Sequence, residues 1–172
     1  AKVLYPPTVL PVLTKNIPIK IKNTLAPTKQ GTLITKKPNN VKANPIKGIS
    51  NINHITLLTL QGNGMVGIPG FSKRLFETLA NEKINIIITT QASSEHSICV
   101  GVSDKDALTA KQAIDKEFEN EISLLKIDPI VLESKLSIVA VIGDRMKNHQ
   151  GISGKMFSTL GKNNVNIRAI AQ

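Results

Sequence analysis

The glycine-rich loop at residues 62–67 is the part of the sequence that most resembles a chemical motif. Its sequence, GNGMVG, matches the G-x-G-x-x-G spacing by which some loops hold the pyrophosphate of a dinucleotide. The position twenty residues after Gly67 is Ile87, however, and not the acid that would hold a ribose. The strand expected after the next helix also leads into a polar turn at 93–96, which is typical of a hairpin and not of a parallel dinucleotide fold. We therefore expect no dinucleotide site.

Other residues that could do chemistry are scattered. The three histidines, at positions 54, 96 and 149, do not stand at metal-ligand spacing from a cysteine or a carboxylate. Ser93 and Glu95 fall with His96 in one tight turn, which does not align three groups as a catalytic triad requires. We predict no catalytic residue, no metal site and no cofactor in this chain.

An internal repeat is the most informative feature of the sequence. Residues 55–91 align with residues 136–172 without a gap, at a constant offset of 81, and ten of the 37 positions are identical. The identical pairs are Gly62/Gly143, Met65/Met146, Gly70/Gly151, Ser72/Ser153, Phe76/Phe157, Thr78/Thr159, Leu79/Leu160, Asn85/Asn166, Ile86/Ile167 and Gln91/Gln172. Two copies of one structural unit explain this agreement.

Each copy predicts a strand, a glycine-containing loop, a helix and a second strand. The first strands are expected at 55–60 and 136–142, and the second strands at 84–90 and 165–171. Apolar residues recur every four positions in each helix, so they share one face. These are Phe71, Leu75 and Leu79 in the first copy and Ile152, Met156 and Leu160 in the second. Asn163 and Asn164 mark the end of the second helix, because asparagine tolerates the left-handed conformation there.

Only the first copy continues beyond this point. A third strand at 97–102, a helix with Ala107, Ala110, Ile114 and Phe118 on one face, and a fourth strand at 122–127 complete the order βαββαβ. That order predicts an α+β, ferredoxin-like fold, with an antiparallel four-stranded sheet and both helices on one face. The second copy stops at Gln172, halfway through its unit, so we expect further residues or another segment to complete its sheet.

The repeated loops and strand ends favour a small-molecule site. A glycine loop before each helix leaves backbone N–H groups at the helix N-terminus, which suit a carboxylate. Gly70 and Gly151 allow a ligand to approach the main chain. Asn85 and Asn166 open the second strands, and Gln91 and Gln172 close them. The alternative, that these amides only end the strands, stays open.

Of the net charge of +10, +9 comes from the first 48 residues, which carry nine lysines, no acid and seven of the nine prolines. Short strands are expected there at 17–22 and 32–35, with a linker at 36–47. We expect a solvated segment and not a nucleic-acid site. The single cysteine, Cys99, excludes a disulfide framework, and no uncharged stretch is apolar enough to cross a membrane.

Several of these stretches resemble the regulatory region of aspartate kinases, most nearly that of the bifunctional aspartokinase–homoserine dehydrogenases. They are GISNI at 48–52, QASSEHS at 91–97 and the run from Gln150 to Gln172. Residues 1–8 and 23–34 resemble the end of the kinase domain. The likeness covers essentially the whole chain, and Tyr5 departs from it, since the family usually has His there.

The resemblance implies ACT domains in tandem that bind an end product of the aspartate pathway, L-threonine or else L-lysine, at interfaces between ACT units. It divides the chain into the end of the kinase domain and linker (1–47), a first ACT domain (48–128) and a truncated second one (129–172). It implies a cytoplasmic homodimer formed through the ACT sheets, and a kinase domain of the same chain that uses ATP and Mg²⁺. Whether a homoserine dehydrogenase domain follows stays open, and so does completion of the second unit by a strand that precedes the first.

In that family the glutamine that closes the second strand contacts threonine, which implies this role for Gln91 and Gln172. The expected effector-binding residues are Asn63, Gly64, Met65, Gly67, Ile68, Gly70, Asn85 and Gln91 in the first copy, and Asn148, Gly151, Ile152, Asn166 and Gln172 in the second. The loops and strands of the site contain one acid, Asp144, which favours threonine because the ammonium of lysine requires a carboxylate. A dimerisation module without a ligand and a basic nucleic-acid binder are the alternatives.

Overall fold

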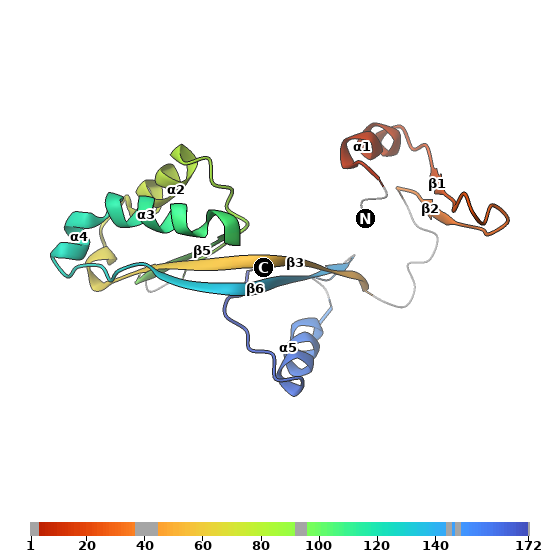
Figure 1. Cartoon of the computed structure of the whole chain (residues 1–172). Coiled ribbons are helices and arrows are strands. Elements are labelled where there is room, and N and C mark those ends of the chain that lie inside the picture. The colour runs from red at the N-terminus through yellow and green to blue at the C-terminus, as the bar shows by residue number, and fades with distance from the viewer. Residues whose placement is uncertain (1–3, 37–44, 92–95, 144–145, 147–148, 172) are drawn as a thin grey trace. The chain divides into compact units, whose positions relative to one another are not determined.

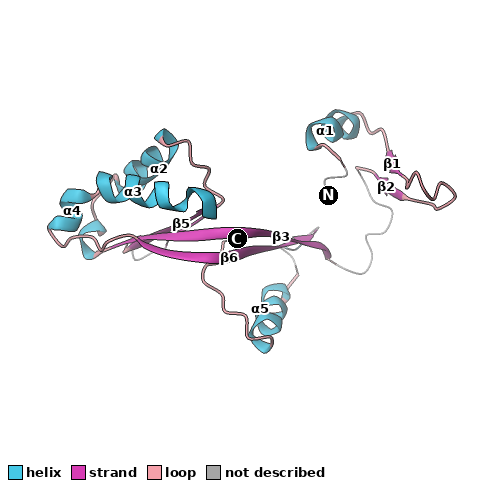
Figure 2. Ribbon diagram, viewed as in Figure 1, coloured by secondary structure: helices cyan, strands magenta, loops and turns pink. Residues whose placement is uncertain are grey.

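The structure, a computed structural model, describes residues 4–36, 45–91, 96–143, 146 and 149–171. The chain divides into two compact units, Ala1–Pro45 and Ile46–Gln172, whose elements are shown in Figure 1 and Figure 2. No helix in the described part of the chain is long and apolar enough to cross a bilayer.

The N-terminal unit contains one helix and one strand pair. Strands β1 (Ile19–Ile21) and β2 (Thr32–Ile34) pair antiparallel, with Ile19 opposite Ile34, which confirms the two predicted strands. Helix α1 (Pro6–Thr14) was not expected from a proline-rich segment. Two of its prolines occupy the first two helical positions, where no N–H donor is needed, so they start the helix.

Two long antiparallel strands run through the C-terminal unit. They are β3 (Ile46–Gln61) and β6 (Val131–Gly143). Their register is symmetric about the pair Ile55–Leu136, because the repeat offset of 81 converts Ile52–Ile138 into Leu57–Glu133. The beginning of each long strand therefore pairs with the later part of the other, so it lies beside the other copy of the repeat.

Both long strands are irregular at the centre of this symmetry. His54 has a φ of +61° and Lys135, its counterpart in the repeat, has a φ of +63°. The register shifts at this point, as it does at a β-bulge, which bends a strand and increases its twist. Thr56, fully buried beside the bulge, donates to Asp104 at 2.6 Å and lies 3.0 Å from the Ser134 hydroxyl.

The first copy is a complete four-stranded unit. After β3 come the short 3₁₀ helix η1 (Asn63–Met65), α2 (Phe71–Asn81), β4 (Ile88–Gln91), β5 (Ser97–Ser103), η2 (Asp104–Asp106) and α3 (Ala107–Glu117). The strand order is β4-β5-β3-β6, with every pair antiparallel, and α2 and α3 lie on one face of the sheet (Figure 1). The predicted α+β, ferredoxin-like fold is confirmed.

The core of this copy follows the predicted apolar faces. All three α2 residues and all four α3-face residues of the prediction are buried. They pack with apolar residues of the central strands and of the segment before β6: Leu58, Leu60, Ile98, Val100, Val102, Ile127 and Ile130. The amphipathic pattern therefore identified the buried faces of both helices.

The predicted fourth strand at 122–127 is wrong. Residues 119–123 form the helix α4 (Glu119–Ser123), and the fourth strand of the sheet comes from the start of β6. Leu125 adopts a φ of +55°, its N–H donates to Ile122, and the N–H of Lys126 donates to Glu121. These two bonds end the helix in a Schellman motif, which turns the chain sharply and breaks the apolar alternation.

The second copy is only partly built. Its helix α5 (Ile152–Lys162) confirms the prediction, and Figure 1 shows it across the strand pair from α2 and α3. Residues 165–171 form no strand, contrary to the prediction. The beginning of β3 pairs with the second-copy part of β6, whereas β1 and β2, the strands of the N-terminal unit, pair only with each other.

Candidate functional site

The two copies present the same helix start. Gly70 precedes α2 with a φ of +107°, and Gly151 precedes α5 with a φ of +83°. No side chain caps either helix, and a Cβ added to either glycine would meet nothing within 4 Å. The glycines are therefore required by the left-handed backbone and not by packing, and the space beside each helix start is open.

The loop before α2 is less available than the sequence predicted. The Gly62 N–H donates to His96, and the Gly64 N–H donates to the Lys126 carbonyl at 2.9 Å. The N–H groups of Met65, Val66 and Ile68 donate to carbonyls within the loop. These five N–H groups hold the loop itself in place and are not available to a ligand.

Residues 62–65 have a structural role and residues 66–70 are exposed. A Cβ on Gly64 would lie 2.5 Å from Cβ of Lys126, and Met65 is buried in the core. By contrast Gly67 and Ile68 are exposed, and so is the neighbouring Asn63. Contact with a ligand is therefore expected from the exposed residues and from Gly70, while Gly64 and Met65 support the loop.

A hollow of about 410 Å³ brings the two copies together around Gln91. The first copy contributes the end of β4 and the start of β5, and the second contributes the segment after α5. Its lining residues are Thr90, Gln91, Ser97, Cys99, Ile167, Arg168, Ala169 and Ile170. Hydroxyl groups, an amide and a guanidinium over an apolar floor are suited to a small polar molecule.

Arg168 joins the two sides of this region. Its Nε lies 2.9 Å from Oε2 of Glu133, in the part of β6 that belongs to the sheet of the first copy. Both side chains are about half exposed, so the pair is worth little energy by itself. Sequence reasoning missed both residues, because an isolated arginine and an isolated glutamate carry no pattern.

The other predicted residues are dispersed. Asn85 is exposed and does not line the hollow, because the extended segment 84–91 separates it from Gln91. Asn166 is exposed and precedes the lining segment, and Ile152 is half-buried at the start of α5. Asn148, Gln172 and Asp144 lie outside the described residues.

One carboxylate near the loop was not expected. Asp128 accepts a hydrogen bond from Nε2 of Gln61 at 2.9 Å, and its N–H donates to the Gln61 carbonyl at 2.8 Å. Asp128 follows the turn after α4, which lies outside the loops and strands from which the sequence predicted a single acid. The Asp128 carboxylate therefore already accepts a hydrogen bond from the Gln61 side chain, beside the loop.

The structure gives no support to the other chemical motifs. β4 and β5 pair antiparallel, and the G-x-G-x-x-G loop turns through η1, so no parallel dinucleotide fold follows it. Within the described residues no group of three histidine, cysteine, aspartate or glutamate side chains could hold a metal ion. Ser93 and Glu95 lie outside the described residues, and Cys99 lies 3.4 Å from the hydroxyl of Thr59.

Comparison with known proteins shows where this arrangement recurs. The model of the ACT domain family matches residues 58–118 and 139–172. The bifunctional aspartokinase/homoserine dehydrogenase of Haemophilus influenzae is 40% identical over the whole chain, which covers 21% of that protein. Aspartokinase 3, chloroplastic, of Arabidopsis thaliana is 31% identical, and the chain covers 30% of it. The chain spans about a fifth of the length of the first of these relatives.

Solved structures give the same result. The aspartate kinase of Clostridium acetobutylicum is similar, with a TM-score of 0.83 and 27% identity over 99% of this chain and 39% of that one. Aspartokinase III of E. coli, solved in complex with lysine and aspartate in the T-state, has a TM-score of 0.67 and 26% identity over 99% of this chain and 36% of that one. The resemblance to the regulatory region of aspartate kinases is confirmed by these matches.

Proposed function

Because the chain belongs to the ACT domain family, we propose that it is the allosteric regulatory region of an aspartate kinase and binds an end-product amino acid, L-threonine, where its two ACT units meet. The observation that carries this proposal is the hollow that Thr90 and Gln91 of the first copy line together with residues 167–170 of the second. Its position agrees with an effector site between ACT units.

The proposal extends to the whole protein. The parent enzyme transfers phosphate from ATP to L-aspartate to give 4-phospho-L-aspartate, with ATP and Mg²⁺ bound in a kinase domain of the same chain. Relatives named as bifunctional enzymes support a homoserine dehydrogenase in the same protein. We expect a cytoplasmic homodimer formed through the ACT sheets, with no nucleic acid and no membrane as partner.

The chemistry of the hollow suits a neutral side chain. Threonine presents a carboxylate, an ammonium and one hydroxyl, and the Gln91 amide can pair with that hydroxyl. Within the hollow the guanidinium of Arg168 is the group that suits the carboxylate. Among the described residues that line the hollow there is no acid for the second ammonium of lysine.

Lysine is the second candidate effector. Aspartokinase III of E. coli, a similar structure, was solved with lysine and aspartate, which is the observation in its favour. An effector inhibits the kinase if it binds the inhibited arrangement of the ACT units more tightly than the active one. A differential affinity of about 1–3 kcal/mol gives roughly five- to 150-fold regulation.

Calorimetric titration of the 172-residue chain with L-threonine and with L-lysine tests the effector. We expect heat from threonine, and a loss of about 1–3 kcal/mol of binding free energy in Gln91→Ala, because a hydrogen bond to the ligand is removed. Gln112→Ala is the matched control, since Gln112 is exposed on α3 and does not line the hollow. Heat from lysine alone would exclude threonine, and an unchanged affinity in Gln91→Ala would remove Gln91 from the site.

A thermal shift assay separates the sensor from a ligand-free dimerisation module. A ligand that binds only the folded chain must raise its melting temperature as concentration rises. We expect a rise with threonine and none with serine or alanine at the same concentration. If none of the common amino acids raises the melting temperature, the sensor is rejected.

A further inference from the structure

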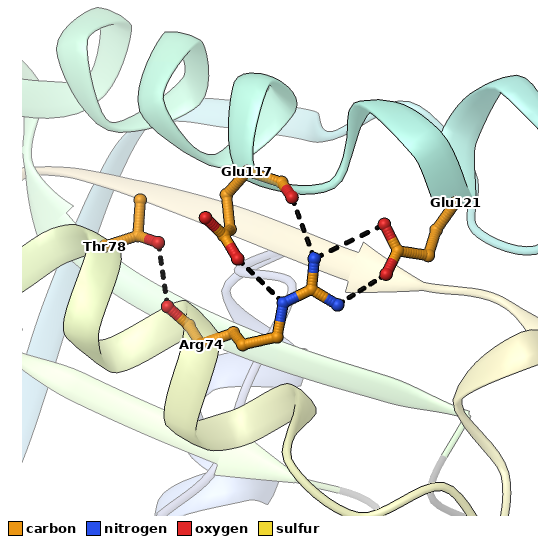
Figure 3. A network of polar contacts seen from close by, with 4 residues as sticks. All are labelled: Arg74, Thr78, Glu117 and Glu121. Atoms are coloured by element: carbon orange, nitrogen blue, oxygen red, sulfur yellow. Dashed lines mark hydrogen bonds and ion pairs between the residues drawn. The ribbon is translucent and has the colours of Figure 1, made fainter.

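Arg74 stands one turn inside helix α2, and its guanidinium joins three helices (Figure 3). Its Nε donates to Oε1 of Glu117 at 2.7 Å, and Nη2 donates to the Glu117 carbonyl at 2.8 Å, at the end of α3. The Glu121 carboxylate, on α4, accepts from Nη1 and from Nη2, the latter at 3.4 Å. The same guanidinium lies 4.4 Å from the centre of the Phe118 ring and 5.8 Å from that of Phe71.

The contacts continue from Glu121 to the glycine loop. The Glu121 carbonyl accepts from the N–H of Lys126 at 2.9 Å and of Ile127 at 3.3 Å. The Lys126 carbonyl in turn accepts from the N–H of Gly64 at 2.9 Å. Without side chains at 62 and 64 the loop lies directly on this backbone, since a Cβ on Gly62 would be 2.4 Å from the Lys126 oxygen.

The other end of the loop is tied to Arg74 through its own helix. The Arg74 N–H donates to the carbonyl of Gly70 at 3.0 Å, in the first turn of α2. Residues 64 and 70 are therefore both held relative to one guanidinium, the first through α4 and its turn, the second through α2. Between them lie the exposed loop residues, Gly67 and Ile68 among them.

We propose that Arg74 is a positioning residue of the effector site, which fixes the loop 62–70 through Glu117, Glu121 and the backbone of Lys126 without touching the effector. The statement about the effector rests on the proposed function, whereas the statement about the loop does not. The planar fork of arginine is essential to it, because lysine offers a single point charge and cannot bind two carboxylates and a carbonyl in one plane.

Another ion pair provides a matched control. Lys111 and Asp115 also form an ion pair, at 2.6 Å, but both lie within α3, one turn apart. The Asp115 carboxylate also accepts from the N–H of Ile130 at 3.4 Å, a contact that Lys111→Gln leaves in place, while the ion pair itself joins two positions of one helix. Loss of the Lys111 charge therefore removes a comparable ion pair without releasing the turn at 124–128.

Amide hydrogen exchange of the 172-residue chain, measured by NMR for wild type, Arg74→Lys, Glu121→Gln and Lys111→Gln, tests the positioning role. We expect the Gly64 amide to lose about two- to thirtyfold of its protection in the first two variants, with Val100 in the central strand β5 unchanged. Lys111→Gln should leave both amides unchanged. Unchanged Gly64 protection in both variants, or an equal loss at Val100, would overturn the proposal.

Threonine affinity of the same variants supplies the second readout. We expect Arg74→Lys and Glu121→Gln to weaken threonine binding by a similar two- to thirtyfold factor, and Lys111→Gln to have no effect. A loosened Gly64 with unchanged affinity would overturn the link to the effector site. If wild type binds no threonine while the Gly64 amide still loses protection in the variants, the proposed function fails, but the role of Arg74 in positioning the loop stands.

Discussion

Leu58 and Ile130 lie in the core around the first copy and are 1% and 4% exposed. The residues related to them by the repeat offset of 81, Val139 and Ile49, are 41% and 71% exposed. The backbone of the two copies is nevertheless alike. Left-handed residues recur at the repeat offset of 81 before each helix, at Gly70 and Gly151, and after it, at Lys83 and Asn164. Local conformation is thus set within each copy, while burial depends on what covers it.

The covering elements in the first copy are β5 and α3, and no element of the described residues takes their place over α5. They close the sheet face over α2, and their residues Val100, Val102, Ala110 and Ile114 belong to its core. In the second copy α5 forms with the same length and the same caps, but none of its residues is buried. An amphipathic sequence is therefore sufficient for the helix and insufficient for the core.

Truncation of the same leucine in each helix gives the largest expected contrast. Leu79→Ala should cost about 2–5 kcal/mol, because it opens a cavity at a fully buried site. Leu160→Ala, at a half-buried site, should cost roughly 1 kcal/mol or less. Chemical denaturation of the 172-residue chain measures both. Equal losses would show that the second copy has a core as tight as the first.

Substitution of the glycine before each helix should destabilise the chain equally in the two copies. Gly70→Ala and Gly151→Ala should each cost about 1–2 kcal/mol, since an alanine Cβ is disfavoured in the left-handed region while neither site is crowded. The same denaturation experiment provides the comparison. A much larger loss at one position would mean that packing, and not backbone conformation, requires its glycine.

The helix ends distinguish the copies again, more weakly. Lys83→Gly should stabilise the chain by about 0.5–1 kcal/mol, because a lysine at a φ of +56° is strained. Asn164→Gly should gain only a few tenths of a kcal/mol, because asparagine tolerates this conformation. Thermal unfolding of the two variants tests the order. A larger gain for Asn164→Gly contradicts it.

The smallest expected effect depends on pH. The hydrogen bond from Arg74 lowers the pKa of Glu121 and raises that of Arg74, whereas among the described residues no carboxylate pairs with Lys155, the second-copy counterpart of Arg74. Since the folded pKa of Glu121 is lowered, its contribution to stability is present above the unfolded value of about 4.3 and is lost as the pH falls through the folded pKa.

Unfolding free energies of wild type and Glu121→Gln between about pH 3 and pH 6 test this sign. The wild type should lose more stability than the variant on acidification. Parallel curves for the two proteins would show that Glu121 does not titrate with folding.

Much of the fold could be predicted from residue pattern. Apolar residues three or four positions apart predicted α2, α3 and α5, and the repeat predicted that α2 and α5 are equivalent. The fourth strand could not be predicted, because Ile122 and Ile127 alternate as strand residues do while Leu125 turns the chain in a conformation that leucine rarely adopts. Pairing between the start of β3 and the end of β6 joins residues far apart in sequence, for which no local pattern exists.

The candidate site was predicted in part. The open glycines and Gln91 follow from the repeat, whereas the salt bridge between Arg168 and Glu133 depends on how the two copies meet. The occupied N–H groups of the loop also could not be predicted, since their acceptors lie at His96 and Lys126. Sequence identified the repeated positions, and tertiary contacts decided which of them are free.

Because β3 and β6 each pair through both of their halves, one half with each copy, this protein cannot be divided simply into its two modules. No cut in the chain yields either module intact: a fragment that ends before Val131 deprives the first of its outer strand, and one that begins after Ile52 deprives the second. The pairing of β3 with β6 must close a long loop, and its entropy cost comes before the favourable contacts form, so neither half is expected to fold before the other. The two modules are interlocked rather than strung together, and a disturbance in one reaches the other along a continuous backbone.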